Sequence, residues 1–497
     1  MKRLALRLIL ALAAVALVAC QPSTPTATPA GRDLFDIPWD DRSVFSAGLI
    51  ASEQAVLGQQ GGASVYHIDL RIADDLLHLD GKQEVRYTNR ETEPLNEVCF
   101  RLFPNLFGGA TEIRTIGVDN QDVEPTYDLA DSAMRVPLSP ALRPSAQAVI
   151  EMAFSVQVPT EGGGGYGMFA LADDILVLAH FYPMIAVYDD EGWNLEIPPE
   201  QGDVIFADSS FFLVRVSTPA AVTLVASGVE IERLTTADRQ QVTYAGGPMR
   251  DFYLAASTQY TVVSKRVGET TINSYAPSEL AGGAKTALRH AVDALRVFGE
   301  RFGAYPFTEF DVVGTPTTAF GIEYPGVVAI ALRMYDPARS EYPPAYLEST
   351  MAHEAAHQWF YSVVGNDQLD EPWLDEALAQ YVTLLYWQDL YGPSGAAGFR
   401  GSLQERWARV EGADIPIGMP VCSYSGKEYG AIVYGRGPLF VEALAQAMGQ
   451  ETLNAFLRDY YETHKWDIAT TEGFKQLAES HCDCDLTPLF SDWVYER

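Results

Sequence analysis

The chain has 497 residues, of which 47% are hydrophobic and 20% are charged, a composition typical of a globular protein with more than one domain. Its 66 acidic residues outnumber its 34 basic residues, so the formal net charge is −32. The acidity argues against nucleic acid as a partner, because phosphate binding requires a basic surface.

The amino terminus has the pattern of a secretory signal peptide. Lys2, Arg3 and Arg7 precede an apolar run at residues 8–19. The run leads into Leu-Val-Ala-Cys, which ends at Cys20 and resembles the bacterial lipobox. In that motif the cysteine is diacylated and becomes the first residue of the mature protein. We therefore expect lipidation at Cys20.

This leader implies an extracytoplasmic protein that a lipid holds at a membrane. We predict a lipoprotein signal peptide at residues 1–20 and a location on the cell surface or the periplasmic side, with the leaflet left open. An ordinary signal peptide with a chance cysteine is the alternative. Export permits disulfides. Four cysteines follow the leader, and they are Cys99, Cys422, Cys482 and Cys484. The sequence allows one disulfide among the last three and leaves its pairing open.

A tether and a short helix are expected after the leader. Residues 21–31 are rich in Pro, Ser, Thr and Ala, which is typical of a flexible tether. Residues 43–60 have the pattern of a short helix. We therefore assign residues 21–60 to a tether and a short helix.

Alternation of apolar and polar residues predicts strands in the next part of the chain. In residues 65–72 it predicts a half-buried strand whose polar side chains, His67 among them, lie on the surface. The same alternation occurs at residues 150–158 and 212–216. We therefore expect a mostly antiparallel β domain at residues 61–262.

The pattern changes from about residue 263. Apolar side chains recur every three or four residues from Leu288 to Phe302, which predicts a helix. Residues 310–314 and 327–331 are predicted strands, and amphipathic helices are expected towards the carboxyl terminus. A second domain is therefore expected at residues 263–497.

A metal-binding motif lies in an apolar, helix-forming run at residues 346–364. It reads His-Glu-x-x-His, and its histidines, His353 and His357, are four residues apart and share one helix face. Two such imidazoles can hold one metal ion, and Glu354 can reach a water molecule at that ion. A buried helix with two hydrogen-bonded histidines is the alternative. Burying Glu354 on an apolar face without a function would, however, be costly.

A second helix is expected to supply a third ligand. A tetrahedral catalytic zinc site needs three protein ligands and one open position. Glu376 follows His357 after eighteen residues. Gly365 can end the first helix and Pro372 suits the first turn of the second. Glu376 would then approach the metal from a neighbouring helix.

These motifs resemble those of the zinc gluzincin aminopeptidases, the family of aminopeptidase N, membrane alanyl aminopeptidase and leukotriene hydrolase. The zinc helix at residues 353–360 and the third-ligand segment at 373–376 match the family's spacing. Phe-Gly-Ile-Glu-Tyr at 320–324 is similar to its G-x-M-E-N signature, and Tyr-Gly-Arg-Gly at 434–437 to the segment of its catalytic tyrosine. With weaker matches elsewhere, the resemblance covers nearly all of the mature chain.

The resemblance implies an α+β fold, in which a mostly antiparallel β domain precedes a thermolysin-like α/β zinc peptidase domain. We expect a short lipoprotein form without the family's large helical C-terminal domain. Phe320, Ile322 and Tyr324 replace the Gly, Met and Asn of the signature, whereas Glu323 is retained. The glutamine that helps to hold the substrate amine has no clear counterpart near residues 180–183. These departures concern exopeptidase specificity more than hydrolysis.

The resemblance also implies the chemistry of the site. It implies one Zn²⁺ ion per chain, held by His353, His357 and Glu376. Glu354 would be the general base, and Tyr434 would be the second donor to the oxyanion.

The same resemblance assigns Glu323 to the free α-amine of the substrate. From the residues alone, Glu323 would be a surface residue and Tyr434 a packing side chain. We therefore predict a zinc-dependent aminopeptidase that releases N-terminal residues from peptides outside the cytoplasm. A zinc peptidase of broader or internal cleavage and a non-catalytic, peptide-binding lipoprotein are the alternatives. The preferred side chain and the oligomeric state are left open.

Overall fold

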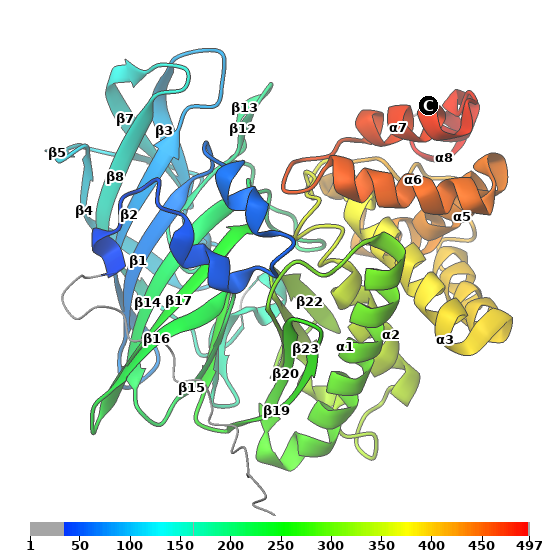
Figure 1. The fold of residues 1–497 in the computed structure, drawn as a ribbon, viewed down its shortest axis with the longest axis horizontal. Coiled ribbons are helices and arrows are strands. Elements are labelled where there is room, and N and C mark those ends of the chain that lie inside the picture. The colour runs from blue at the N-terminus through cyan, green and yellow to red at the C-terminus, as the bar shows by residue number, and fades with distance from the viewer. Residues whose placement is uncertain (1–33, 163, 496–497) are drawn as a thin grey trace, which may run out of the picture. The chain divides into compact units, whose positions relative to one another are not determined.

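The computed structural model describes residues 34–162 and 164–495 (Figure 1). Cys20, the predicted signal peptide and the predicted tether at residues 21–31 lie outside the described residues. The chain divides into two units, Met1–Pro38 and Trp39–Arg497. The described part of the first unit contains one 3₁₀ turn, η1 (Leu34–Asp36). Every other element belongs to the second unit.

Two short 3₁₀ helices replace the single helix expected at residues 43–60. They are η2 (Ser43–Gly48) and η3 (Gln54–Gly58). Between them the backbone is extended at Leu49, which forms an isolated β-bridge with Phe307. This bridge to a distant segment interrupts the helix.

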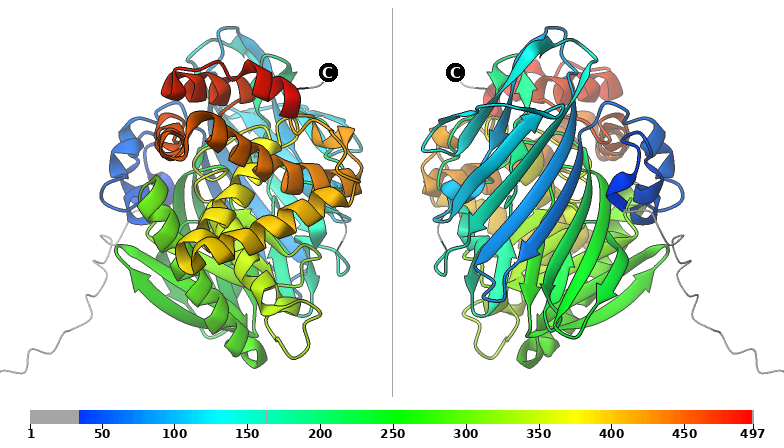
Figure 2. Two further views of the ribbon diagram at one scale, coloured as in Figure 1. Left: turned by 90° about the vertical axis from the view of Figure 1, so that its right-hand side faces the viewer. Right: turned by 90° about the vertical axis from the view of Figure 1, so that its left-hand side faces the viewer.

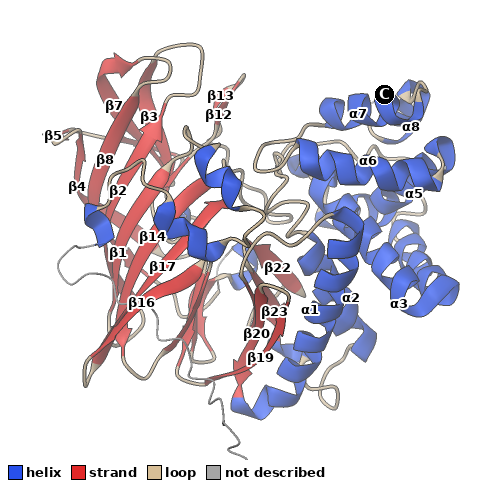
Figure 3. Cartoon of the chain, in the orientation of Figure 1, coloured by secondary structure: helices blue, strands red, loops and turns tan. Residues whose placement is uncertain are grey.

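The β-rich part of the second unit contains four sheets within the described residues (Figure 3). The eight-stranded sheet has the order β16 (Val229–Thr235), β17 (Arg239–Met249), β14 (Ser210–Pro219), β1 (Val65–Ile72), β2 (His78–Thr88), β8 (Gln147–Gln157), β4 (Ala110–Val118) and β5 (Gln121–Asp122). One four-stranded sheet has the order β15 (Thr223–Ala226), β18 (Leu254–Ser257), β10 (Ile175–Leu178) and β9 (Phe169–Ala172). The other has the order β11 (Met184–Ile185), β3 (Leu95–Arg101), β7 (Ala133–Leu142) and β6 (Thr126–Asp128). A hairpin joins β12 (Tyr188–Asp189) and β13 (Gly192–Trp193).

Within these sheets β1 and β14 run parallel and the other paired strands are antiparallel, which confirms a mostly antiparallel β part. The predicted strand at residues 65–72 has the bounds of β1.

His67 on β1 is buried, so its predicted surface position is wrong. Only 6% of its surface is exposed, and its ring stacks on Trp39 with the ring centres 4.3 Å apart. Residues 39–58, called the strap below, cover this part of the sheet. The strap also contacts the carboxyl-terminal part, where the Ile50 amide donates to the Pro306 carbonyl at 2.9 Å. Alternation within one strand cannot show that a distant segment covers its polar face.

A five-stranded mixed sheet and a set of helices form the carboxyl-terminal part (Figure 1). The strand order is β19 (Tyr260–Val267), β20 (Thr270–Pro277), β21 (Glu309–Thr315), β23 (Val327–Ala331) and β22 (Gly321–Tyr324). The helices are α1 (Ala281–Phe302), α2 (Pro344–Ala356), α3 (Trp373–Ala408), α4 (Gly426–Ala431), the π-helical η9 (Ile432–Arg436), α5 (Gly437–Met448), α6 (Gln450–Thr463), α7 (Thr471–Cys482) and α8 (Thr487–Trp493). Further 3₁₀ turns are η4 (Phe103–Asn105), η5 (Gly165–Gly167), η6 (Ser278–Leu280), η7 (Leu332–Met334) and η8 (Val421–Ser423).

The predicted helix through Leu288 and the predicted strands at residues 310–314 and 327–331 are confirmed as α1, β21 and β23. The expected boundary between residues 262 and 263 stays a prediction, and β19 spans it. Within the second unit, Figure 2 shows the large sheet on one side and the helices on the other.

The cysteines take the one disulfide that the sequence allowed. Cys482 is bonded to Cys484, whereas Cys99 is buried and free and Cys422 is exposed and free. In the part of the chain that the structure describes, no helix combines the length and the apolar character needed to cross a membrane.

Candidate functional site

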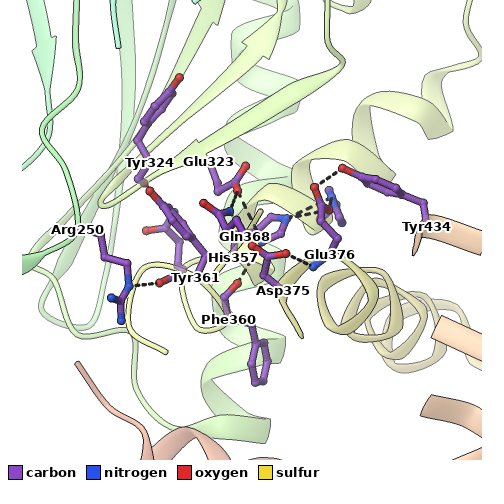
Figure 4. Close-up of polar contacts among 12 residues, drawn as sticks. Arg250, Glu323, Tyr324, His357, Phe360, Tyr361, Gln368, Asp375, Glu376 and Tyr434 are labelled. Carbon is purple, nitrogen blue, oxygen red and sulfur yellow. Dashed lines mark hydrogen bonds and ion pairs between the residues drawn. The ribbon is translucent and has the colours of Figure 1, made fainter. Parts of the chain in front are cut away.

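The three predicted metal ligands meet where α2 and α3 pack together. Figure 4 shows two of them, His357 and Glu376, beside each other. His353 Nε2 lies 3.1 Å from Glu376 Oε2, and His357 Nε2 lies 3.5 Å from the same oxygen. The two Nε2 atoms are 3.3 Å apart. The structure therefore confirms that Glu376, from the neighbouring helix α3, lies beside the two histidines.

This geometry fits a zinc ion. A tetrahedral zinc with ligand bonds of about 2.0–2.2 Å would separate its nitrogen and oxygen ligands by roughly 3.3–3.5 Å. His357 Nδ1 lies 3.1 Å from the Phe360 carbonyl oxygen, so it is placed to donate its proton there and leave the Nε2 lone pair for a metal. Burial lowers the pKa of His353 to about 4, which favours the neutral imidazole that a metal requires.

The helix that carries both histidines is shorter than expected, because α2 ends at Ala356 and not near Val364. His357 keeps helical angles, with φ −63° and ψ −15°, so it still faces His353. Tyr361 then has a φ of 140°, which is strained for a residue with a side chain. The chain turns there and places the Phe360 carbonyl beside His357.

Glu354 is buried beside the ligands without being one of them. Burial first, and then the charge of Glu323, raises the pKa of its carboxyl well above the usual range. A Cβ atom at Gly321 on β22 would lie 2.5 Å from Glu354 Oε1, so only glycine leaves room for this carboxylate. The sequence alone did not reveal this reason for the glycine.

Glu376 has the opposite electrostatic environment. Burial tends to raise the pKa of its carboxyl, but the close contacts with His353 and His357 outweigh burial and lower the pKa well below its usual range. The Tyr434 hydroxyl also donates a very short hydrogen bond to Glu376. Tyr434 lies on the π-helical η9, and such a helix places side chains where a regular helix would not.

Glu323 lies on β22 inside the site, not on the surface. It is 6% exposed, and its Oε1 atom is 4.0 Å from His357 Nδ1 and 3.5 Å from Gln368 Nε2. Burial is the main cause that raises the pKa of Glu323 to about 7. Gln368 also donates to Asp375 at 2.6 Å, so one amide links two carboxylates of the site.

Asp203, from the β-rich part, is a site residue that sequence reasoning missed. Carboxylate oxygens of Asp203, Glu323 and Asp375 lie within 4.8 Å of one another. Burial, and then repulsion from Glu323, raises the pKa of Asp203 well above its usual range. No motif marks it, because it lies in an irregular segment far from the zinc motif in sequence. The β-rich part thus supplies an acidic group where the family's glutamine had no counterpart.

Most of these groups, Asp203 among them, line one cleft of about 850 Å³. The ligands His353 and Glu376 lie on its wall together with Glu354, Glu323 and Tyr434. The volume is sufficient for a short peptide.

Comparisons with known proteins identify relatives of this chain. Residues 286–493 match the family model of the Peptidase family M1 domain. The chain is 25% identical over 277 residues to "Probable aminopeptidase 2" of Sulfurisphaera tokodaii, covering 52% of this chain and 34% of that protein. It is 23% identical over 298 residues to "Aminopeptidase M1" of Arabidopsis thaliana, covering 58% of this chain and 34% of that protein. The chain therefore spans about a third of the length of these curated relatives.

Solved structures share the fold over most of the chain. The M1 zinc metallopeptidase of Deinococcus radiodurans superposes with a TM-score of 0.63 at 19% identity, covering 87% of this chain and 94% of that one. A mutant of a two-domain M1 zinc metallopeptidase bound to L-arginine superposes with a TM-score of 0.65 at 20% identity, covering 88% and 95% of the two chains. Residues 286–493, which contain the His-Glu-x-x-His motif and Glu376, therefore form a peptidase M1 domain.

Proposed function

We propose that this protein is a zinc-dependent aminopeptidase that removes N-terminal residues from peptides. The observation that carries the proposal is the position of Glu323 and Asp203. They form an acidic group directly beside three residues that fit one zinc ion per chain. Zinc held by His353, His357 and Glu376 would supply a Lewis acid that polarises the scissile carbonyl and lowers the pKa of water from about 15.7 toward about 7.

Glu354 is the proposed general base. Its buried carboxylate would take the proton of the attacking water and pass it to the leaving amine. A raised pKa suits this role, because the group must hold the proton between the two transfers. Tyr434 would turn its hydroxyl from Glu376 to the substrate oxygen as negative charge develops there.

The acidic group would bind the substrate's protonated α-amine. An ammonium group beside Glu323 and Asp203 would favour their ionised forms and relieve their mutual repulsion. Because Glu323 is next to His357, an amine held there places the first peptide bond at the metal. This arrangement supports aminopeptidase action over internal cleavage. The complete set of catalytic side chains supports catalysis over peptide binding alone.

The direct experiment measures hydrolysis of a panel of amino-acid arylamides. We expect cleavage of substrates with a free amine, poor cleavage of their N-acetylated forms, and loss of both with a chelator. Cleavage of free and acetylated substrates at equal rates would contradict the aminopeptidase proposal.

The first variant tests the amine anchor. Glu323→Ala removes a charged hydrogen bond worth about 1.5–3 kcal/mol, so the ratio of kcat/KM for the free to the acetylated substrate should fall about tenfold to a hundredfold. Asp203→Asn should lower the same ratio. Glu405→Gln, which alters an exposed carboxylate of the same cleft, is the matched control. An unchanged ratio in Glu323→Ala would show that Glu323 does not hold the amine.

We further propose an extracytoplasmic location, with the mature protein anchored to the membrane by lipid on Cys20. The support is the basic and apolar leader that ends at this cysteine. Cys20→Ser should release the protein from the membrane fraction or leave the precursor uncleaved. Stable anchoring needs more than one acyl chain. Metabolic labelling with palmitate detects the lipid on Cys20, and an unlabelled wild-type protein would exclude the anchor.

A further inference from the structure

The cleft continues past Tyr434 to a half-buried arginine. Arg406, near the end of α3, lines the same cleft as His353 and Glu354. Its guanidinium carbon lies over the Tyr434 ring, 5.8 Å from the ring centre. The centre of the Tyr434 ring is in turn 5.9 Å from that of His353.

The guanidinium of Arg406 has no carboxylate partner among residues 34–162 and 164–495. Among its neighbours, Arg400 on the same helix binds Glu442 and Arg436 binds Asp414, whereas Arg409 is exposed to solvent. Acidic residues outnumber basic ones in this chain by 66 to 34, so an unpaired, half-buried guanidinium is unexpected. Removing a cation from water without a partner is costly, and a bound anion would offset that cost.

Local packing holds Arg406 beside Tyr434. A Cβ atom at Gly435 would lie 3.0 Å from the Arg406 Cβ and 2.8 Å from the Trp407 amide nitrogen. Glycine at this position therefore lets η9 approach α3 closely. The contact of the guanidinium with the Tyr434 ring engages no carboxylate, so its N–H groups are left for one.

The cleft thus has its buried acidic group on one side and the half-buried guanidinium of Arg406 on the other. A series of contacts leads from Glu323 to His357, then to His353, Tyr434 and Arg406. The acidic group lies at the first end and the guanidinium at the other. A short peptide has the matching pattern, with an ammonium at one end and a carboxylate at the other.

We propose that Arg406 binds a carboxylate of the substrate beyond the scissile bond, and that this selects short peptides. The carboxylate is the C-terminal one of a dipeptide or tripeptide, or that of an acidic side chain at the same distance. An extended residue advances about 3.3–3.6 Å, so the two ring contacts between His353 and Arg406 allow at most about three residues between the metal ligand and the guanidinium, a span that a dipeptide or tripeptide does not exceed. This inference rests on the proposed peptidase function.

The test compares peptides that differ only at the carboxyl end. Peptides of two to five residues with one N-terminal residue are assayed as free acids and as C-terminal amides. A third arm uses amides with Glu at the second or third position. We expect the ratio of kcat/KM for free acid to amide to be largest at two or three residues. In Arg406→Gln that ratio should fall about tenfold to a hundredfold, because the variant loses a charge-assisted hydrogen bond to the carboxylate.

Two further variants separate this role from a general effect of charge. Arg406→Lys keeps the charge but loses the two-pronged hydrogen bond, so it should restore only part of the ratio. Arg409→Gln removes an exposed charge one turn further along the chain and should leave the ratio nearly unchanged. If the amides that contain Glu are cleaved by wild type with the kcat/KM of the free acids, and Arg406→Gln abolishes this gain, then Arg406 binds the side-chain carboxylate. A ratio near one at every length, or one unaffected by Arg406→Gln, would overturn the proposal.

A binding measurement separates this proposal from the proposed function. Glu354→Gln protein is titrated with a free tripeptide and with its amide, with and without Arg406→Gln. Tighter binding of the free acid that depends on Arg406 supports carboxylate recognition even if the wild type cleaves no peptide. Equal binding of acid and amide contradicts it even if the wild type is an active aminopeptidase.

Discussion

At the residue scale, the site gives two glutamates of the same chemistry opposite tasks. Glu376 lies beside His353 and His357 and accepts a hydrogen bond from Tyr434, and these neighbours hold its carboxylate ionised. Glu354 is buried, and no hydrogen bond joins it to another side chain in the described part of the chain. Burial raises its pKa, so it can accept a proton. One carboxylate is suited to bind metal and the other to transfer protons.

This difference predicts distinct losses in two variants. Glu354→Gln should reduce kcat at least about a hundredfold to ten-thousandfold, because it removes the general base, yet retain about one zinc per chain. Glu376→Ala should lose zinc on dialysis, since two histidines alone do not complete the site. Zinc per chain is measured by atomic emission. Glu405→Gln is the control, which should keep both its zinc and its kcat. Zinc lost from Glu354→Gln and kept in Glu376→Ala would reverse the assignment.

At the element scale, one arginine connects the β-rich part to the loop after the zinc helix. Arg250, directly after β17, donates to the carbonyl of Tyr361 at 2.7 Å (Figure 4). It also donates to the carbonyl of Val363 at 3.2 Å and to the carbonyls of Ala207 and Asp467. These bonds hold the strained backbone of Tyr361, and with it the carbonyl that orients His357.

Gly365 is part of the same arrangement. A Cβ atom there would lie 2.0 Å from the guanidinium carbon of Arg250, so a larger residue would displace the arginine. The sequence pattern predicted a helix end at Gly365. The structure instead shows that it makes room for Arg250.

Arg250→Met should weaken zinc binding as well as stability. The substitution leaves buried carbonyls without a donor, each costing about 1–3 kcal/mol. It also releases the Phe360 carbonyl, the hydrogen-bond partner of His357. Loss of such a partner of a metal ligand typically lowers metal affinity about tenfold to a hundredfold. Thermal melting and zinc competition against a chelating dye measure the two effects. Arg101→Met removes a buried arginine that donates to the Glu196 carbonyl away from the metal, so it should lower stability alone. Equal zinc affinity in both variants would contradict the role.

At the scale of the whole second unit, the strap joins the two parts that form the cleft. It stacks Trp39 on His67 of β1, and its Gly48 carbonyl accepts from the Thr308 amide of the other part at 3.0 Å. Burial, and then the charges of Arg42 and Arg86, lowers the pKa of His67 from 6.5 to about 4. The folded protein therefore keeps His67 neutral at pH values where the unfolded chain protonates it.

This shift predicts a pH dependence of stability. The contribution of neutral His67 to the free energy of unfolding is complete above about pH 6.5. It is lost as the pH falls toward about 4, because the unfolded state then binds more protons than the folded state. At pH 5 the loss is roughly 2 kcal/mol. His67→Phe keeps an aromatic ring on Trp39 but cannot titrate, so its melting temperature should fall less than that of wild type between pH 7 and 5. His78→Phe, at an exposed histidine, is the control. Parallel curves for wild type and His67→Phe would contradict the prediction.

Features that depend on local sequence were predictable. The spacing of His353 and His357 fixes their common face, since four residues make about one helical turn. Strands such as β1 follow from alternation, because successive side chains point to opposite faces of a strand. Glu376 was identified by its distance from the motif, and the structure brings it to the histidines.

Features that depend on contacts between distant segments required the tertiary structure. Asp203 carries no motif, and only the packing of the β-rich part against the zinc helix brings it near Glu323. His67 is buried by the strap, and α2 ends early because the loop after it is held by Arg250. A single strand or helix specifies which side chains share a face. Which other segment covers that face, and which charges it contributes, is decided only when the whole unit packs.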